Sequence, residues 1–241
     1  MEDLLVWQLV DSAFPTGAFA HSLGLEAAAQ HGEVASREDL RRFVEATILQ
    51  AASGALPLVN AAYREPARLA EWDALNDAFL SNAVANRASR QQGRTLVASA
   101  ARIFASSTLD ALHARVVSTP NSQSPTPKAL PTSNSQGPAP ALLAHAAPMT
   151  GAVFASLGVT LETTQRMVLF VAARGVLSAA VRLGVTGSYD AQRLQSECAG
   201  WIGRVLLRYG DAGPDDLAQT APVIDILQGA HDRLYSRLFQ S

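Results

Sequence analysis

The fold class is decided by the stretch Ser36-Arg37-Glu38-Asp39-Leu40-Arg41-Arg42-Phe43-Val44-Glu45-Ala46-Thr47-Ile48 of this 241-residue chain. Ser36 and Asp39 have the spacing of a capping box, in which two side chains satisfy free backbone amides at the start of a helix. The apolar or small side chains that follow share one helical face: Leu40, Phe43, Val44, Thr47 and Ile48. This stretch therefore predicts an amphipathic helix that begins at Ser36.

The same helical spacing recurs in the second half of the chain. There the stripe consists of Ala191, Leu194, Cys198, Trp201, Ile202, Val205 and Tyr209. Alternating apolar and polar runs between turn residues, the usual sign of strands, are hard to find. We therefore predict an all-α fold, a compact bundle of about ten helices. We expect these near 3–10, 22–31, 36–53, 56–64, 66–81, 84–106, 149–157, 161–185, 190–209 and 222–239.

One segment interrupts the helical pattern. Residues 118–141 are rich in Ser, Thr, Asn and Gln and hold six of the twelve prolines. Such a composition buries too little apolar surface to offset the entropy lost on ordering. We expect a disordered linker or long loop here. Because neither half shows its own complete core pattern, we predict a single domain over residues 1–241.

Charge and cysteine content exclude several classes of partner. The net charge is −2 and the isoelectric point near 6.2, so no basic field is present to hold nucleic acid or an anionic membrane surface. The most apolar stretch, 168–185, is interrupted by Arg174 and Arg182, which argues against a transmembrane helix. A single cysteine, Cys198, and an acidic start predict a protein of the reducing cytoplasm.

The sequence lacks the residues that most enzymes and cofactor-binding proteins need. Of the 19 basic residues 18 are arginine, and the one lysine, Lys128, lies in the 118–141 segment. A phosphate-binding P-loop or a Schiff base therefore has no lysine in a folded position. The five histidines are scattered without metal-ligand spacing: His21, His31, His113, His145 and His231. We predict no metal site, no cofactor and no catalytic residue.

Two residues allow more than one interpretation. Cys198 lies in an apolar stripe, which favours a buried, inert thiol over a nucleophile. His231 shares a predicted helical face with Ile224, Leu227, Leu234, Tyr235 and Leu238, which favours a core or interface histidine over a metal ligand. A small helical enzyme that uses Cys198 or a histidine stays the least favoured alternative.

Four segments, in a fixed order, resemble one protein family. They are residues 11–26, residues 87–94 with Arg94, residues 178–183 with Arg182, and the ending formed by 221–226 and 231–241. The first contains Pro15, Gly17, Phe19, His21, Ser22, Gly24 and Glu26. In order and spacing these segments are similar to the UreF family of urease accessory proteins, over essentially the whole chain outside 118–141.

Elementary chemistry gives the first segment a structural interpretation. We expect Pro15 and Gly17 to form a turn, Phe19 to fill part of the core, and Ser22 to cap a helix. Gly24 would let another backbone approach closely. The chain also departs from the family, since it has Ala146 and Ala147 after His145 where the family usually has an aromatic residue followed by proline.

The resemblance implies a function. UreF-like proteins are all-α, nonenzymatic maturation factors that dimerise, bind UreD (also called UreH) and recruit the nickel-carrying GTPase UreG to urease apoenzyme. A protein of this kind works by presenting surfaces. We expect its partner-binding residues at the C-terminal end, which carries His231, Tyr235, Arg237, Leu238 and Phe239. An alternative is regulation of the UreG GTPase by an arginine, with Arg237, Arg182 and Arg94 as candidates.

Overall fold

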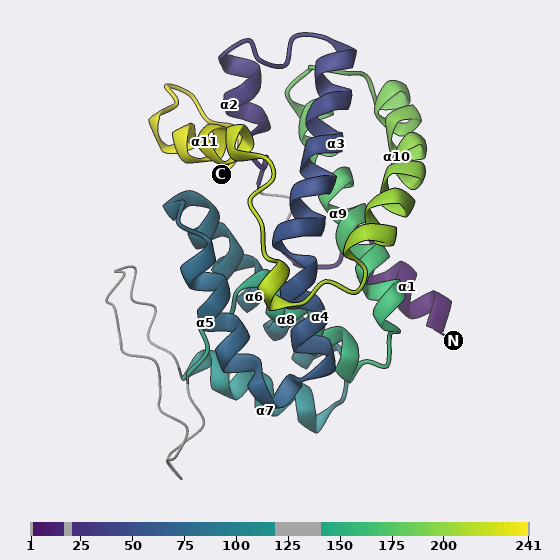
Figure 1. Ribbon diagram of the computed structural model, residues 1–241, viewed down its shortest axis with the longest axis vertical. Coiled ribbons are helices and arrows are strands. Elements are labelled where there is room, and N and C mark those ends of the chain that lie inside the picture. Colours follow the sequence, from purple (N-terminus) through teal and green to yellow (C-terminus); the bar gives the residue numbers. More distant parts are fainter. Residues whose placement is uncertain (1, 17–20, 119–140, 241) are drawn as a thin grey trace.

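The computed structural model describes residues 2–16, 21–118 and 141–240, and this part of the chain is all-α (Figure 1). It contains no strand within those ranges, which confirms the predicted fold class. The α-helices are α1 (Glu2–Val10), α2 (Leu25–Gln30), α3 (Arg37–Gly54), α4 (Leu56–Arg64), α5 (Leu69–Phe79), α6 (Ala83–Ile103), α7 (Ser107–Val117), α8 (Ala146–Ser156), α9 (Leu161–Arg182), α10 (Ser188–Tyr209) and α11 (Pro222–Ala230). Short 3-10 helices lie at Pro66–Arg68, Pro214–Asp216 and His231–Arg233.

The capping box predicted at Ser36 is present. The Ser36 amide donates to Asp39 Oδ2 (3.0 Å), and the Asp39 amide donates to Ser36 Oγ (3.2 Å). These hydrogen bonds satisfy two of the backbone donors that a helix start leaves free. Leu40, Val44 and Ile48 are fully buried along the inner face, as the helical spacing predicts.

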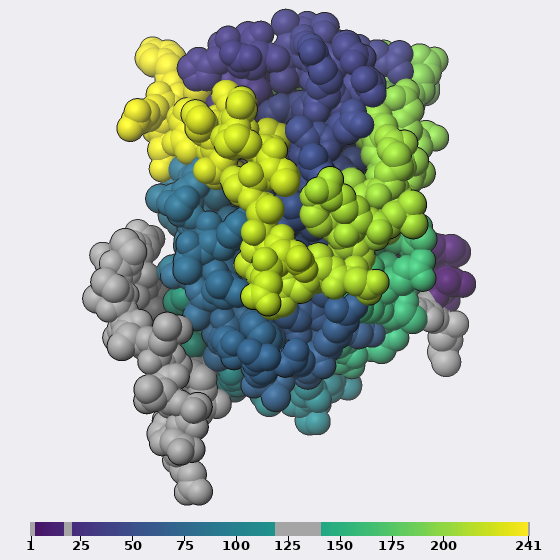
Figure 2. Space-filling model, viewed as in Figure 1, coloured from purple at the N-terminus to yellow at the C-terminus, as the bar shows by residue number. Residues whose placement is uncertain are grey.

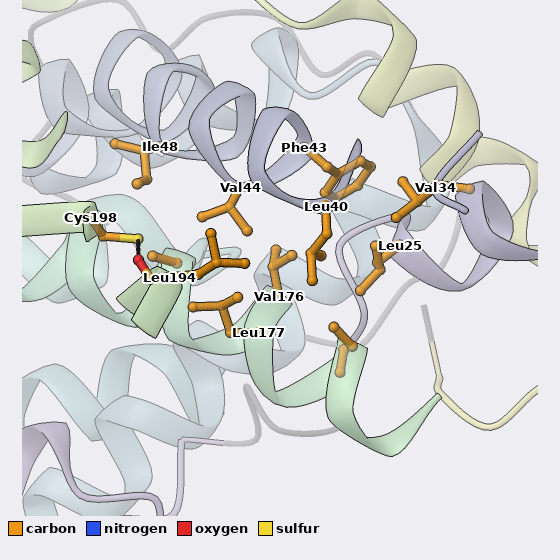
Figure 3. Packing of buried hydrophobic residues seen from close by; sticks show 14 of the residues in the cluster. Leu25, Val34, Leu40, Phe43, Val44, Ile48, Val176, Leu177, Leu194 and Cys198 are labelled. Atoms are coloured by element: carbon orange, nitrogen blue, oxygen red, sulfur yellow. Dashed lines mark hydrogen bonds between the residues drawn. The ribbon is translucent and has the colours of Figure 1, made fainter. Parts of the chain in front are cut away.

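Two apolar clusters form the core of the bundle. The first joins α2, α3, α9 and α10, and Figure 3 shows Leu40, Val44 and Ile48 of α3 pointing toward Val176 and Leu177 of α9. The second joins α4, α6 and α8 and includes Leu58, Ala62, Leu96, Val97, Met149 and Val153. Burial of a large apolar side chain contributes about 1.5–3 kcal/mol, so these clusters supply the main stabilisation.

The helix α9 crosses the centre of the bundle and contributes to both clusters. Among the described helices it alone has the length and apolar composition of a membrane span, and half of its most apolar stretch is buried inside the bundle. A central core helix of a globular protein typically has this composition. Its buried face includes Leu169, Ala173 and Val176.

The structure differs from the predicted helices at several boundaries. A helix that we did not predict, α7, lies between α6 and the 118–141 segment, with Ser106 at its N-cap. Ser22 does not cap α2, which begins at Leu25 after Gly24 in the left-handed conformation. The expected helix over 222–239 ends at Ala230, for a reason given below. The predicted disorder of the Pro/Ser-rich segment concerns residues 119–140, which lie outside the described residues.

A buried carboxylate fixes the start of α8. Asp73 of α5 is almost fully buried, and its two oxygens accept the backbone amides of Ala144 (2.9 Å) and His145 (2.8 Å). Gly93 of α6 faces the same segment, where a Cβ atom would lie only 2.0 Å from the Ala144 carbonyl oxygen. The glycine of the 87–94 signature therefore lets α6 pass directly against the chain that enters α8.

The His145 side chain completes this contact between α5, α6 and α8. Ser89 Oγ accepts the Ala146 amide (3.1 Å), so its own proton is free to point to His145 Nδ1 at 3.2 Å. The other ring nitrogen, Nε2, then carries the proton and donates to Asp77 Oδ1 (3.0 Å). Burial lowers the pKa of His145, against the opposing effect of the two aspartates, so the neutral ring is favoured.

The first prediction concerns the pH dependence of stability. Below the ordinary histidine pKa of 6.5, the unfolded chain binds a proton that folded His145 resists. The free energy of unfolding should thus be level above that pH and fall as the pH drops below it. We expect the His145→Gln variant to be less stable than the unmodified chain. Its free energy of unfolding, measured by urea denaturation, should nevertheless fall less between about pH 8 and about pH 5.5. An equal decline in both proteins would contradict this.

The second prediction concerns Cys198, which is fully buried in the first cluster. Its thiol donates to the Leu194 carbonyl oxygen (3.1 Å, Figure 3), and burial, with a smaller effect of Glu197, raises its pKa to about 11. A thiol of this kind is almost entirely protonated at neutral pH and is a poor nucleophile. We expect no labelling by a maleimide reagent in the native protein and complete labelling in urea. Rapid native labelling would revive the enzyme alternative.

Candidate partner-binding site where the two ends of the chain meet

The folded bundle brings the two terminal signature segments together. In Figure 1 the helix α11 and the C-terminus lie beside α2, whose first two residues end the first signature. Gly24 makes this packing possible, because a Cβ atom there would lie 3.1 Å from the Gln228 amide nitrogen and 3.2 Å from the Ile224 carbonyl oxygen of α11. Its φ of +86° also favours glycine. The predicted close approach of another backbone at Gly24 is confirmed.

The C-terminal tail, residues 234–240, is not helical. After α11 the chain makes one 3-10 turn, and Leu234 is extended with φ −65° and ψ 138°. The prediction that His231, Tyr235 and Leu238 share a helical stripe is therefore wrong. His231 is buried, whereas Tyr235 is fully exposed and Leu238 is about half exposed. The apolar residues of the sequence keep helical spacing across this region. The backbone amides of the tail, however, donate to an acceptor other than the carbonyl oxygens of a helix.

That acceptor is Glu26 on α2, a carboxylate that is 2% exposed. The Leu238 amide donates to Glu26 Oε1 (2.6 Å) and the Phe239 amide donates to Oε2 (3.2 Å). Nearby, Gln30 Nε2 donates to the Ser236 carbonyl oxygen (3.0 Å). Charge-assisted hydrogen bonds of this kind compensate a buried carboxylate for its lost hydration. The tail is thus attached to α2 through its backbone, which leaves its side chains free for other contacts.

One buried histidine, His231, lies next to Glu26, and a second, His21, interacts with His231. His231 Nε2 is 3.2 Å from the Phe239 carbonyl oxygen, and because a carbonyl only accepts, this nitrogen carries a proton. The other ring nitrogen lies 3.8 Å from Glu26 Oε2, within ion-pair range when the ring is protonated. His21, also buried, has a pKa lowered by burial and, to a smaller degree, by His231. The signature residues His21 and Glu26 therefore meet the C-terminal signature directly.

Phe239 closes the site on the inside. It is 6% exposed, and the guanidinium carbon of Arg182 lies 4.2 Å from the centre of its ring, a cation–π contact between α9 and the tail. We expected Phe239 to be a partner-binding residue and hence exposed, and this exposure is wrong, because its ring is buried as part of the first cluster. Arg182, a candidate for insertion into a GTPase, is engaged in this contact.

The outer face of the junction is apolar with one adjacent guanidinium. We call the residues Val223, Ile226, Tyr235, Arg237 and Leu238 the tail surface. Its four apolar members are 54–105% exposed. Arg237 Nη1 lies 3.6 Å from Asp232 Oδ1. Figure 2 shows the C-terminal residues, in yellow, on the surface next to α2.

Four of the remaining signature residues lie elsewhere or outside the described residues. The Pro15 carbonyl oxygen accepts Ser99 Oγ (2.7 Å) and so ties the first segment to α6. Arg94 lies on α6 next to Gly93, and its half-buried side chain keeps a buried Nε atom that has no hydrogen-bond partner. Gly17 and Phe19 lie outside the described residues, so the expected turn and core contact stay predictions.

A pocket of about 360 Å³ lies between the two apolar clusters and adjoins the junction of α2 and α11. Its lining is mostly apolar and includes Leu23, Val171 and Phe154, with His21 and Gln228 from the junction. Among the described residues, no three His, Cys, Asp or Glu side chains are grouped to hold a metal ion.

Sequence reasoning missed several residues of these sites. Asp73 and Asp77 lie four residues apart on α5, a spacing that places both on one helical face and was available as a signal. Asp232 and Arg87 lie 145 residues apart, and only the fold brings them into contact. No local pattern indicates such a pair.

The third prediction tests the attachment of the tail. Glu26→Ala leaves the amides of Leu238 and Phe239 without an acceptor, which should lower the free energy of unfolding by about 2 kcal/mol. Hydrogen exchange at these two amides should accelerate more than the loss of global stability explains. Exchange at amides of α3 and α9 should change only as much as global stability does. Glu33→Ala, an exposed glutamate after α2, is the matched control. Unchanged exchange in the tail would show that Glu26 does not hold it.

Comparison with known proteins identifies a family that this chain resembles over most of its length. The model of the UreF family matches residues 34–199. Urease accessory protein F of Arabidopsis thaliana is 37% identical over 238 residues, which covers 98% of this chain and 91% of the relative. The protein of the same name from Oryza sativa subsp. japonica is 36% identical over 235 residues, covering 97% and 83%.

A bacterial relative extends the similarity. Urease accessory protein UreF of Arthrobacter sp. (strain FB24) is 30% identical over 239 residues, covering 99% of this chain and 96% of the relative. Each of the three similarities covers at least 97% of this chain. The family model and the near-complete coverage together show that the chain belongs to the UreF family.

Proposed function

We propose that this chain is a non-catalytic urease maturation factor. It bridges UreD (UreH) and the nickel-carrying GTPase UreG, and in this way promotes nickel insertion into urease apoenzyme. The names of its relatives support a role in urease maturation. The observation that carries the bridging role is the tail surface, which is apolar, exposed and attached through backbone hydrogen bonds to Glu26.

The composition of the tail surface fits a protein partner. Binding energy at interfaces concentrates in aromatic and arginine side chains surrounded by apolar contacts. Tyr235 is fully exposed and Arg237 is adjacent in sequence to Leu238, while Val223 and Ile226 extend the apolar area along α11. Exposed large apolar residues that form one patch mark interaction sites in soluble proteins, and we propose that these residues form such a patch. We assign this surface to the UreD and UreG assembly.

A bridging factor needs further contact surfaces, and the chain has a second exposed apolar face. On α1, Leu4 and Trp7 are 65% and 66% exposed, while Leu9 is buried in the second cluster. Figure 1 shows α1 far from α11 across the bundle. This separation supports simultaneous contacts with different chains, and our proposal includes a homodimer. We further infer that residues 1–241 act as one domain in the cytoplasm.

A second candidate function is regulation of the UreG GTPase by an arginine. Of the three candidates, Arg182 contacts Phe239 and Arg94 is half-buried, whereas the Arg237 side chain is 48% exposed at the tail surface. An inserted arginine stabilises charge on the transferred phosphoryl group. Turnover of GTP by UreG, measured with and without this chain, distinguishes regulation from bridging alone.

The fourth prediction tests the tail surface. Arg237→Ala removes an exposed side chain, so the helical circular dichroism and melting temperature should stay almost unchanged. The affinity for UreD and UreG together should fall by about 2 kcal/mol, the scale of an interface hot spot, and urease activation should fall with it. Affinity is measured by calorimetry or biolayer interferometry.

The control is Arg193→Ala, which removes an exposed ion pair with Asp190 on α10. This variant should assemble and activate like the unmodified chain. If Arg237→Ala assembled as well as this control, the tail surface would not be the docking site.

A further inference from the structure

Two arginines converge on one carboxylate beside the tail. Arg87 Nη2 of α6 donates to both oxygens of Asp232, at 3.1 and 2.9 Å. Arg237 Nη1 of the tail lies 3.6 Å from Asp232 Oδ1. Asp232 belongs to the 3-10 turn after α11, so three separate segments meet at this carboxylate.

The position of the carboxylate is well determined by the fold. Asn82, the N-cap of α6, donates from Nδ2 to the Asp225 carbonyl oxygen of α11 (2.7 Å). Asn82 and Arg87 therefore attach α11 and the following turn to α6 at two points. The hydrogen bonds from Arg87 of α6 thus hold Asp232 in place independently of Arg237.

This cluster has little to do with folding stability. All three side chains are about half exposed, at 44–51%. Exposed ion pairs of this kind add little to stability, because water and salt screen the two charges. What the carboxylate does restrict is the conformation of Arg237, whose long side chain would otherwise sample many rotamers in water. Ordering such a side chain on binding costs affinity, and ordering it beforehand avoids that cost.

We infer that Asp232 is a positioning residue that orients the Arg237 guanidinium for the partner, with Arg87 as a second cation at the same point. The inference rests on the proposed docking role of Arg237. Two guanidinium groups and one carboxylate leave an excess positive charge. The group that docks there is therefore a carboxylate of the partner protein, since a bidentate Arg–carboxylate pair matches this geometry.

The test measures binding of the full chain to UreD and UreG by biolayer interferometry. Asp232→Asn keeps the size of the side chain and removes its charge. We expect binding to weaken about fivefold, with the melting temperature unchanged. Asp232→Glu should restore most of the affinity, because it returns a carboxylate to the two arginines. The control is Asp211→Asn, an exposed aspartate paired with Arg64 at 3.2 Å, which should bind normally.

The double variant shows whether Asp232 acts through Arg237. In a chain that already carries Arg237→Ala, adding Asp232→Asn should cause no further loss of affinity, whereas independent effects would add. Normal or tighter binding of Asp232→Asn, or additive losses, overturns the inference while a weakened Arg237→Ala still supports the proposed function. If Arg237→Ala itself binds normally, the docking role of the tail surface fails as well.

Discussion

The buried carboxylate of Glu26 is the constraint on which the junction depends. A charged group that is 2% exposed requires compensation, and two backbone amides of the tail supply it. Because those amides are used by Glu26, they cannot continue the helix of α11. The last residues therefore follow a non-helical path beside α2, with Phe239 buried against Arg182 and Tyr235 exposed. One hydrogen-bonded carboxylate thus decides which tail side chains reach solvent.

The same physical solution occurs at the start of α8. Asp73 is buried on α5 and accepts the backbone amides of Ala144 and His145, just as Glu26 accepts those of the tail. In both places a chain segment without secondary-structure hydrogen bonds enters the bundle, and a buried carboxylate provides them. In both places a glycine on a neighbouring helix or turn, Gly93 or Gly24, removes the Cβ atom that would block the approach. Gly24, Gly93, Glu26 and Asp73 thus have structural roles in packing these segments against the bundle.

This architecture suits a protein that works by presenting a surface. The apolar clusters make the bundle rigid, and the tail adds exposed apolar residues and one guanidinium without taking part in the core except through Leu234 and Phe239. The contacts that orient Arg237 are exposed ion pairs, which cost the fold little when they are broken. The residues that stabilise the fold are therefore largely different from those that we propose for recognition.

The sequence by itself determined the all-α class, the start of α3 at Ser36 and the buried face with Leu40, Val44 and Ile48, because capping and helical spacing depend on residues close in the chain. It also determined the family, through short segments whose order and spacing are specific. Only the tertiary structure decided where α11 ends and which tail residues are exposed. The acceptor for Leu238 and Phe239 is Glu26, more than 200 residues earlier in the chain. A local pattern carries no information about such a partner. Helical periodicity therefore predicted a helix through residues whose backbone amides donate instead to Glu26.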